Sequence, residues 1–266
     1  MERYAKFLPA GAACHHGRQW LSAALLVFVI AGGGVAGSST ANRTPVLVEL
    51  FTSEGCSSCP PADALVGTLD STQPFPDAQL IVLEEHVDYW DDQGWRDPFS
   101  SHALTLRQSE YVEKLHLKTG PYTPQMVVDG SEAFVGSNRI QAAGAVERAA
   151  RTPKVRMEIS SLDPEKGKIS AHISTGAVPE KAEVLVAVAL DRAQSKVLRG
   201  ENGGRQLQHV AVVSRLSSVG KVKPGESFSK DVTINLPSSG QGHRIVAFLE
   251  EEGSGRVLGA AEAHVR

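Results

Sequence analysis

The chain has 266 residues, of which 41% are hydrophobic and 21% are charged, and its formal net charge is −3 at pH 7. This composition is typical of a folded globular protein and excludes both a disordered chain and one filled with membrane spans. The slight acidic excess argues against nucleic acid as a partner, because phosphate binding needs a basic surface.

The first 41 residues carry the pattern of an export signal. Arg3, Lys6 and Arg18 precede an apolar run at 21–31, and small residues follow it. A basic segment, an apolar core and a small-residue cleavage zone in that order are typical of a secretory signal peptide. We therefore expect residues 1–41 to be a signal peptide and the protein to be periplasmic or secreted. If the leader stays uncleaved, it anchors the chain and the membrane becomes a partner.

Strand and helix patterns alternate from residue 45 to residue 150. Apolar runs of strand length alternate with segments in which apolar residues recur at i, i+3, i+4 and i+7. These patterns predict strand 45–51, a helix from Pro60, strand 78–87, helix 102–117, a hairpin turning at Asp129-Gly130 and helix 139–150. The order β-α-β-α-β-β-α predicts parallel pairing through the helices and a terminal hairpin.

After Pro153 the pattern changes to short β-rich runs separated by Gly, Pro, Ser and Asp turns. Such spacing predicts an antiparallel sandwich of roughly seven strands. The segment 199–215 is unusual, because it is polar and Gly-rich before it turns apolar. His209, Glu201 and Arg205 in it form either a second polar site or part of a solvated loop, and we expect the solvated loop.

Two cysteines, Cys56 and Cys59, stand where the first strand runs into the first helix. A Cys-X-X-Cys pair at a helix start is a signal for a redox site, because free amides there stabilise a thiolate. Cys56 would attack a substrate disulfide, and Cys59 would resolve the mixed disulfide. The alternative is a structural disulfide, although closing a four-residue loop contributes only about 2 kcal/mol.

Three further residues are candidates for the catalytic site. Pro124 begins a predicted strand after a turn, so the Thr123–Pro124 bond is a candidate cis peptide that would lie against the cysteine pair. Glu49 lies within the first apolar strand, where a carboxylate is costly unless it is paired or its pKa is raised. It would either shuttle a proton to Cys59 or face solvent.

A loop rich in histidine, aspartate and tryptophan follows the second strand, from His86 to Asp97. Thiolates and imidazole suit a soft metal, so Cys56, Cys59 and His86 together are an alternative copper site. The simpler interpretation is a loop that packs its aromatic side chains for stability.

Together these observations predict an α/β thioredoxin-like domain over residues 42–152, followed by an all-β sandwich-like domain of unknown role over residues 153–266. The function predicted is thiol–disulfide exchange through Cys56 and Cys59, with the thiols or disulfides of other exported proteins as partners and with no cofactor. The alternatives are copper handling by the cysteines and His86, or a non-catalytic binding protein in which the disulfide is structural.

Five segments of the chain resemble the motifs of domain-of-unknown-function family 1223. They are VELFTSEGCSSCPPADALV, EEHVDYWDDQGWRDPF, RQSEY, YTPQMVVDG and RGENGGRQLQH, and the resemblance runs from about residue 45 to the C-terminus. The resemblance implies secretion and a thioredoxin-like N-terminal fold in which Cys56, Cys59 and Pro124 occupy the site positions. It implies no established activity.

Overall fold

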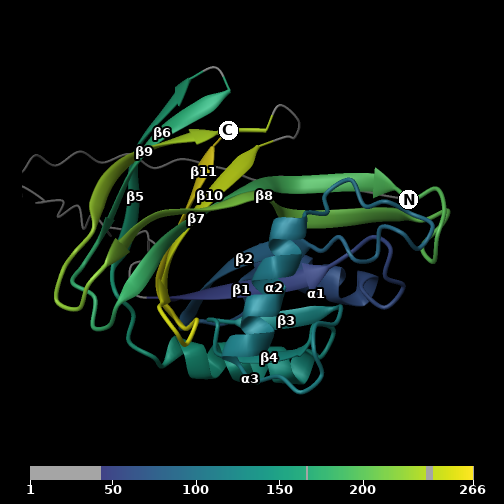
Figure 1. Ribbon diagram of the computed structural model, residues 1–266, viewed down its shortest axis with the longest axis horizontal. Coiled ribbons are helices and arrows are strands. Elements are labelled where there is room, and N and C mark those ends of the chain that lie inside the picture. The colour runs from purple at the N-terminus through teal and green to yellow at the C-terminus, as the bar shows by residue number, and fades with distance from the viewer. Residues whose placement is uncertain (1–42, 166, 238–241, 266) are drawn as a thin grey trace, which may run out of the picture. The chain divides into compact units, whose positions relative to one another are not determined.

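The computed structural model describes residues 43–165, 167–237 and 242–265 (Figure 1). Its elements are β1 (Thr44–Thr52), α1 (Pro60–Thr72), β2 (Ala78–His86), α2 (His102–Lys114), β3 (Gln125–Val128), β4 (Glu132–Val135), α3 (Arg139–Ala150), β5 (Met157–Glu165), β6 (Lys168–Thr175), β7 (Ala182–Lys196), β8 (Gln206–Val222), β9 (Ser229–Asn235), β10 (His243–Glu251) and β11 (Val257–Val265). The predicted signal peptide lies outside the described residues. Within the described ranges, no helix combines the length and the hydropathy that crossing a membrane requires.

The order of elements predicted for the first half of the chain is confirmed. β1 pairs with β2 in parallel, as predicted, and β3 and β4 form the predicted hairpin. The parallel pairing predicted through the second helix is wrong, because β3 pairs with β1 in antiparallel fashion. The hairpin turns at Asp129 and Gly130, whose φ angles are 48° and 61°. Positive φ at both positions is what an Asp-Gly hairpin turn supplies at little cost. α3 begins where the side chain of Asn138 accepts a hydrogen bond from the backbone N–H of Gln141.

The predicted fold class, an α/β domain followed by a separate β sandwich, is wrong. β8 pairs in parallel with β2 at Glu84 and Val212, so strands from the second half continue the sheet that β1 and β2 begin. The result is a mixed eight-stranded sheet in the order β11-β10-β7-β8-β2-β1-β3-β4. The physical reason is that β2 has a bare edge in the first half alone, and β8 supplies its missing neighbour.

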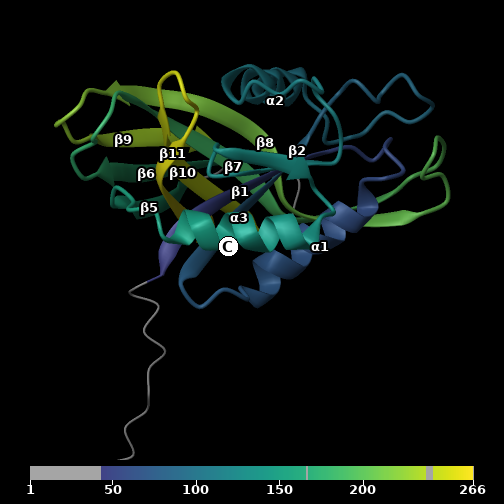
Figure 2. The same cartoon turned by 90° about the horizontal axis from the view of Figure 1, so that it is seen from below.

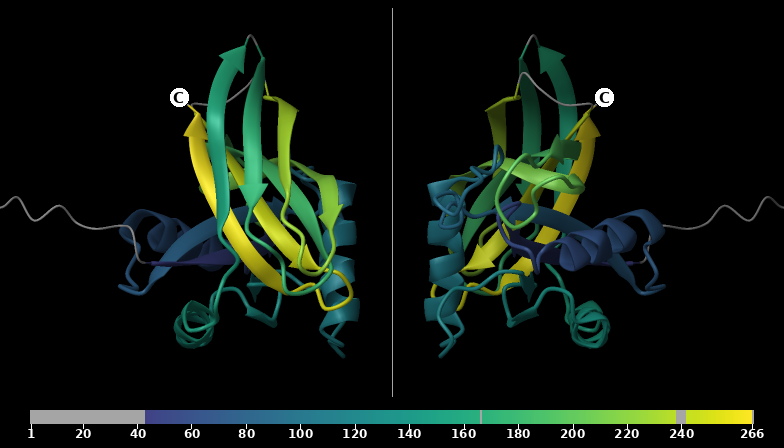
Figure 3. Two further views of the ribbon diagram at one scale, coloured as in Figure 1. Left: turned by 90° about the vertical axis from the view of Figure 1, so that its left-hand side faces the viewer. Right: turned by 90° about the vertical axis from the view of Figure 1, so that its right-hand side faces the viewer.

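The eight-stranded sheet is covered on both faces. α1 and α3 lie on one face and α2 on the other (Figure 2). β5, β6 and β9 form a separate three-stranded sheet that packs near the C-terminal strands (Figure 3). Ile169 and Ile173 of this small sheet share one buried apolar cluster with Ile245 and Leu249 of β10. The sandwich predicted from the sequence therefore exists only in part, because one of its layers belongs to the large sheet.

The β7–β8 hairpin places residues from the second half of the chain beside the cysteine pair. Both strands are long, with 15 and 17 residues, and they extend beyond the segment that pairs with β2 (Figure 1). The connection between them, residues 197–205, lies against the loop between β1 and α1 through hydrogen bonds described below. The loop that carries the cysteines thus has neighbours from both halves of the sequence.

Candidate functional site

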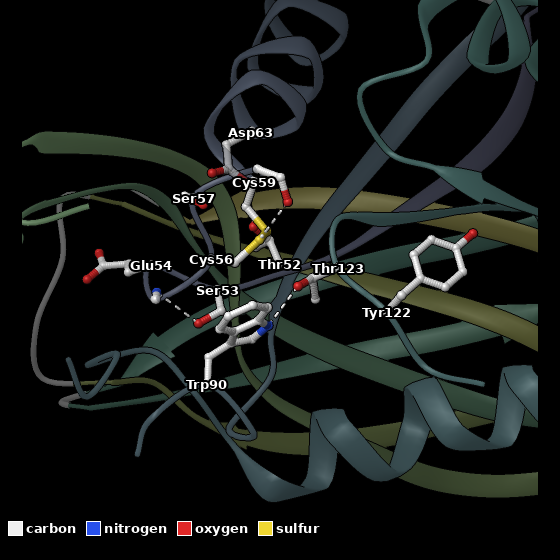
Figure 4. The surroundings of a disulfide bond; sticks show 12 residues. Thr52, Ser53, Glu54, Cys56, Ser57, Cys59, Asp63, Trp90, Tyr122 and Thr123 are labelled. Carbon is white, nitrogen blue, oxygen red and sulfur yellow. Dashed lines mark hydrogen bonds between the residues drawn. A yellow bond between two sulfur atoms is a disulfide. The ribbon is translucent and has the colours of Figure 1, made fainter. Parts of the chain in front are cut away.

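Cys56 and Cys59 form a disulfide in the loop between β1 and α1 (Figure 4). Cys59 stands at the N-cap position of α1, and Pro60 follows it as the first helical residue. Proline is favoured there, because that position lacks an intrahelical partner for a backbone N–H. Both cysteines are 0% exposed, whereas Ser57 and Ser58 between them are exposed. The redox-capable pair is therefore present but lies beneath the surface.

Trp90 covers the disulfide on one side. Its indole Nε1 donates a hydrogen bond to Oγ1 of Thr123 at 2.8 Å, and Figure 4 shows both residues beside the cysteines. The Thr123–Pro124 peptide bond is cis, as expected from the sequence, and Pro124 is buried. Gly55 permits the close approach of the tryptophan, since a Cβ at that position would lie 3.0 Å from Cβ of Trp90. The structure therefore brings Thr123 and Pro124 to the cysteine loop.

The connection between β7 and β8 covers the same loop from another direction. The buried side chain of Asn202 donates through Nδ2 to the backbone oxygens of Glu54 and Cys56, each at 2.9 Å. The carboxylate of Glu201 accepts a hydrogen bond from the backbone N–H of Ser57 at 3.0 Å. The segment that the sequence indicated to be a solvated loop is thus a cover, here called the disulfide cover, over residues 54–57.

Asp63 is a buried carboxyl group one helical turn after Cys59. Its Oδ1 accepts a hydrogen bond from Oγ1 of Thr52 at 2.6 Å, and its backbone N–H donates to the carbonyl oxygen of Cys59. Burial, followed by the negative charge of Glu84, raises the pKa of Asp63 to about 7. Sequence reasoning missed this residue, although an acidic residue between Ala62 and Leu65 on an apolar helical face was the available signal.

Glu49 does not join the cysteines. It is fully buried on the face of β1 toward α2, where Nε of Arg107 donates to it at 2.7 Å and the hydroxyl of Tyr111 at 2.6 Å. Nη1 of Arg107 also donates to Glu250 at 3.0 Å. We call this group the arginine cluster, and its members are Glu49, Glu85, Arg107, Tyr111 and Glu250. These hydrogen bonds satisfy Glu49 within the arginine cluster and away from Cys59.

A second buried group of charged side chains lies where β2, β8 and the loop after β2 meet. We call it the histidine cluster, and its members are Glu54, Glu84, His86, Asp97 and His209, all of them buried. Nδ1 of His86 lies 2.7 Å from Oδ2 of Asp97, and Nδ1 of His209 lies 3.1 Å from Oε2 of Glu84. The two imidazole rings lie with their centroids 4.7 Å apart. The copper set predicted from the sequence is not assembled, since His86 faces these groups and both cysteines are in the disulfide.

The carboxylates of the histidine cluster determine the protonation of its histidines. Burial acts to lower the pKa of His86, but the charge and the hydrogen bond of Asp97 outweigh it and raise that pKa to about 9. Burial likewise opposes the positive form of His209, yet hydrogen bonds to Glu54 and Glu84 hold its pKa well above the usual value. This part of the structure therefore stabilises positive charge strongly.

The sequence contains patterns from which Glu84 and His209 of the histidine cluster could be predicted to be buried. Glu84 and Glu85 are adjacent in an apolar strand, and because neighbouring side chains point to opposite faces, both faces of β2 receive a carboxylate. In β8, Leu207 and His209 are buried while Gln206 and Gln208 are exposed. This period of two places His209 on the inner face of a strand.

Comparisons with known proteins were consistent with one family across most of the chain. A family model described as "Protein of unknown function (DUF1223)" matches residues 47–250. No curated protein matches the chain. Among solved structures, the chain is similar to a protein of Agrobacterium tumefaciens from a structural genomics consortium, with 25% identity, coverage of 84% of this chain and 94% of that one, and a TM-score of 0.61. The sporulation control protein Spo0M of Bacillus subtilis matches 42% of this chain and 47% of its own at 16% identity, and its TM-score of 0.26 carries no argument.

Proposed function

We propose that this chain, which belongs to the family of proteins of unknown function DUF1223, carries out thiol–disulfide exchange through Cys56 and Cys59 with other exported proteins. The observation that supports the proposal is the disulfide at the first turn of α1, with Thr123 and Pro124 beside it. A pair that closes only a short loop contributes little as a staple, because the entropy lost by the unfolded chain grows with loop length. Its position at a helix N-terminus favours a thiolate leaving group.

The exchange begins when a substrate thiolate attacks Sγ of Cys56. A mixed disulfide forms between the substrate and Cys56, the Cys56–Cys59 bond breaks, and Cys59 leaves as a thiolate. We assign the supply of a proton to Cys59 to the buried carboxyl group of Asp63, which stands in the next turn of α1 and has a pKa raised to about 7. A second substrate thiolate then attacks the mixed disulfide, which releases an oxidised substrate and Cys56 as a thiolate. Two electrons pass from the substrate to the protein, and the reverse sequence reduces a substrate disulfide.

Access to Cys56 requires movement of its covering residues, because the cysteine is fully buried. The disulfide cover is attached to the cysteine loop by the hydrogen bonds of Glu201 and Asn202. Gly200 of the disulfide cover also packs against Gly94 and Trp95 of the loop after β2, so the disulfide cover has to separate from both loops to expose Cys56. The proposal therefore includes opening of the disulfide cover before the substrate thiolate arrives.

The reduction potential of the pair tests the proposal. We would equilibrate the full chain, with Cys14→Ser to leave two cysteines, in thiol buffers and trap the free thiols. A potential above about −230 mV places the pair among exchanging disulfides, and one below about −300 mV identifies a bond that stays closed. The second result would overturn the proposal in favour of a structural disulfide.

Trapping of the mixed disulfide provides a second test with a matched pair of variants. With Cys59→Ser, a peptide that contains a disulfide should become attached to Cys56 and remain attached as a mixed disulfide. With Cys56→Ser, the same peptide should attach much more slowly, since Cys59 stands behind it at the helix start. Equal attachment to both variants, or to neither, would contradict the roles assigned to the two sulfurs.

A further inference from the structure

We infer that Glu84, His86 and His209 form a binding site for one divalent transition-metal ion such as Zn²⁺. The site is separate from the proposed exchange reaction and uses no cysteine. One ligand atom from each of the three residues lies within 4.8 Å of the other two, and all three side chains are buried. Two histidines and one carboxylate are a ligand set that zinc takes in catalytic sites.

The ligand atoms are spaced as a metal requires. Oε2 of Glu84 lies 3.1 Å from Nδ1 of His209 and 3.9 Å from Nε2 of His86. Ligands at about 2.0–2.2 Å from a tetrahedral zinc ion lie roughly 3.3 Å from one another. Small rotations of the three side chains therefore complete the coordination.

Each histidine uses one ring nitrogen toward Glu84, and its other ring nitrogen lies near a second carboxylate. Nδ1 of His86 lies 2.7 Å from Asp97, and Nε2 of His209 lies 3.4 Å from Oε1 of Glu54. Asp97 is itself fixed, because the backbone N–H groups of Glu54 and Phe99 donate to it. Histidine ligands of metals commonly donate their other N–H to a carboxylate, which orients the ring and raises its basicity.

Unpartnered polar atoms point to a missing ligand. Nε2 of His86 and Oε1 of Glu84 are buried, and neither has a hydrogen-bond partner among the described residues. Buried polar groups in folded proteins are nearly always paired, so each exception needs an explanation. A metal ion bound by Nε2 of His86 supplies the missing partner of that nitrogen, and it would lie on the same carboxylate as the unpartnered Oε1 of Glu84.

The charges of the histidine cluster also favour a metal ion. Its three carboxylates, Glu54, Glu84 and Asp97, form ion pairs only with His86 and His209 among the residues that the structure describes. A metal ion that binds the two imidazoles displaces the proton from each ligating nitrogen, and its double positive charge then balances these carboxylates. The absence of sulfur from the ligand set favours zinc over a softer metal such as Cu(I).

A cavity lies beside the site. A cavity of about 450 Å³ lies between α1 and the β7–β8 hairpin, and Asp63 and His209 are among the residues that line it. His209 is the one proposed ligand that lines this cavity, and because its side chain is fully buried, an entering metal ion has to displace covering atoms to reach it. Three protein ligands leave a fourth position for water or for a substrate atom, which is the arrangement of a catalytic rather than a structural zinc site.

Equilibrium dialysis of the full chain with Cys14→Ser tests the inference. The protein is treated with a chelator, dialysed against Zn²⁺, and its bound metal is counted. We expect about one zinc ion per chain, at least a hundredfold weaker binding with His209→Gln, and a 10–100-fold loss with Asp97→Asn, which acts through His86. The matched control is His172→Gln, because His172 also pairs with an aspartate, Asp231, but on the outer small sheet. The inference would be overturned if the unaltered protein bound zinc no more tightly than His209→Gln does.

Two measurements keep the inference testable if a variant fails to fold. Co²⁺ bound to the unaltered protein should show a spectrum of nitrogen and oxygen ligands, and a sulfur-to-cobalt charge-transfer band would overturn the inference. The double variant Cys56→Ser, Cys59→Ser should keep its zinc, while loss of zinc would assign the metal to the cysteines. Zinc binding by this double variant does not depend on disulfide exchange. The two proposals can therefore be overturned independently of each other.

Discussion

The arginine cluster and the histidine cluster lie on opposite faces of β2, and they are neutralised in different ways. Glu85 points into the first and Glu84 into the second, because neighbouring strand residues face opposite sides. In the arginine cluster, Arg107 supplies a permanent positive charge within 3.0 Å of both Glu49 and Glu250. In the histidine cluster, the positive charge has to come from protonated imidazole or from a bound cation.

The two clusters differ in whether the chain itself supplies a permanent positive charge to balance their buried carboxylates. Burial and the charge of Glu49 raise the pKa of Glu85 well above its usual range, and this outweighs the charge of Arg107, whose Nε lies 3.5 Å from Oε1 of Glu85, so Glu85 tends to hold a proton. The arginine cluster therefore reaches balance from within the chain. Unpartnered carboxyl oxygens remain in both clusters, on Glu85 in the first and on Glu84 in the second, but only the histidine cluster also holds unpartnered imidazole nitrogens, on His86 and His209. A buried ion group with its own cation serves the fold, whereas one without it is suited to binding.

The largest expected effect is the loss of the permanent cation. Arg107→Met leaves Glu49 buried without its cation and leaves Glu250 with Lys114 alone, and removing one member of a buried ion pair costs about 3–5 kcal/mol. Denaturant-induced unfolding should show a loss of that size in the free energy of unfolding. His209→Gln, measured without metal, should lose less, since its nearest carboxylates can take up protons. A larger loss in His209→Gln than in Arg107→Met would reverse the comparison.

Addition of zinc should affect only the histidine cluster. At a zinc concentration 100 times the dissociation constant, binding to the folded state raises the free energy of unfolding by about 2.7 kcal/mol. Thermal unfolding with and without Zn²⁺ measures this change. His209→Gln should remove the effect, while Arg107→Met and the surface control His172→Gln should retain it. An equal zinc effect in His209→Gln would place the ion elsewhere.

Glu49 distinguishes a structural carboxylate from a catalytic one. Glu49→Gln weakens hydrogen bonds to Arg107 and Tyr111, and a hydrogen bond to a charged group contributes about 2 kcal/mol. The free energy of unfolding should fall by that amount, while the rate of disulfide exchange stays unchanged. A slower exchange with unaltered stability would return Glu49 to the role of proton shuttle.

The smallest expected change in stability comes from the disulfide cover. Asn202→Ala removes two hydrogen bonds to the cysteine loop, and we expect a loss of about 1 kcal/mol with reduction of the disulfide by dithiothreitol roughly tenfold faster. The control is Gln208→Ala, an exposed residue on the adjoining strand. Zinc binding should persist in both variants. Unchanged reduction kinetics in Asn202→Ala would show that this residue does not limit access to Cys56.

Local patterns predicted the elements of the first half, because the information lies within each segment. Apolar periodicity in α1 and the Asp129-Gly130 turn depend on neighbours a few residues away, and both are confirmed. The pairing of Glu84 with Val212 could not be predicted in the same way. Two apolar strands are compatible with many partners, and nothing local specifies that β8 is the neighbour of β2.

The candidate site was predictable to a similar extent. The disulfide, Thr123 and Pro124 lie together as the motif indicated, because the Cys-X-X-Cys spacing and the position of the proline are local features. Glu49 satisfied the expectation of a buried carboxylate, but its partner Arg107 lies on a distant helix. His209 was interpreted as part of a solvated loop, because the polar residues before it concealed the alternation of β8.

The junction between β2 and β8 also sets an order of events for a chain that emerges from the ribosome. Until β8 has been synthesised, β2 presents an uncovered edge, and edge strands of this kind pair readily with other chains. Pairing between segments so far apart in the sequence is slow to form. A nascent chain of this protein therefore stays vulnerable to aggregation until most of its length is made. Bound chaperones over this interval would protect β2, and truncation before β7 should yield insoluble product.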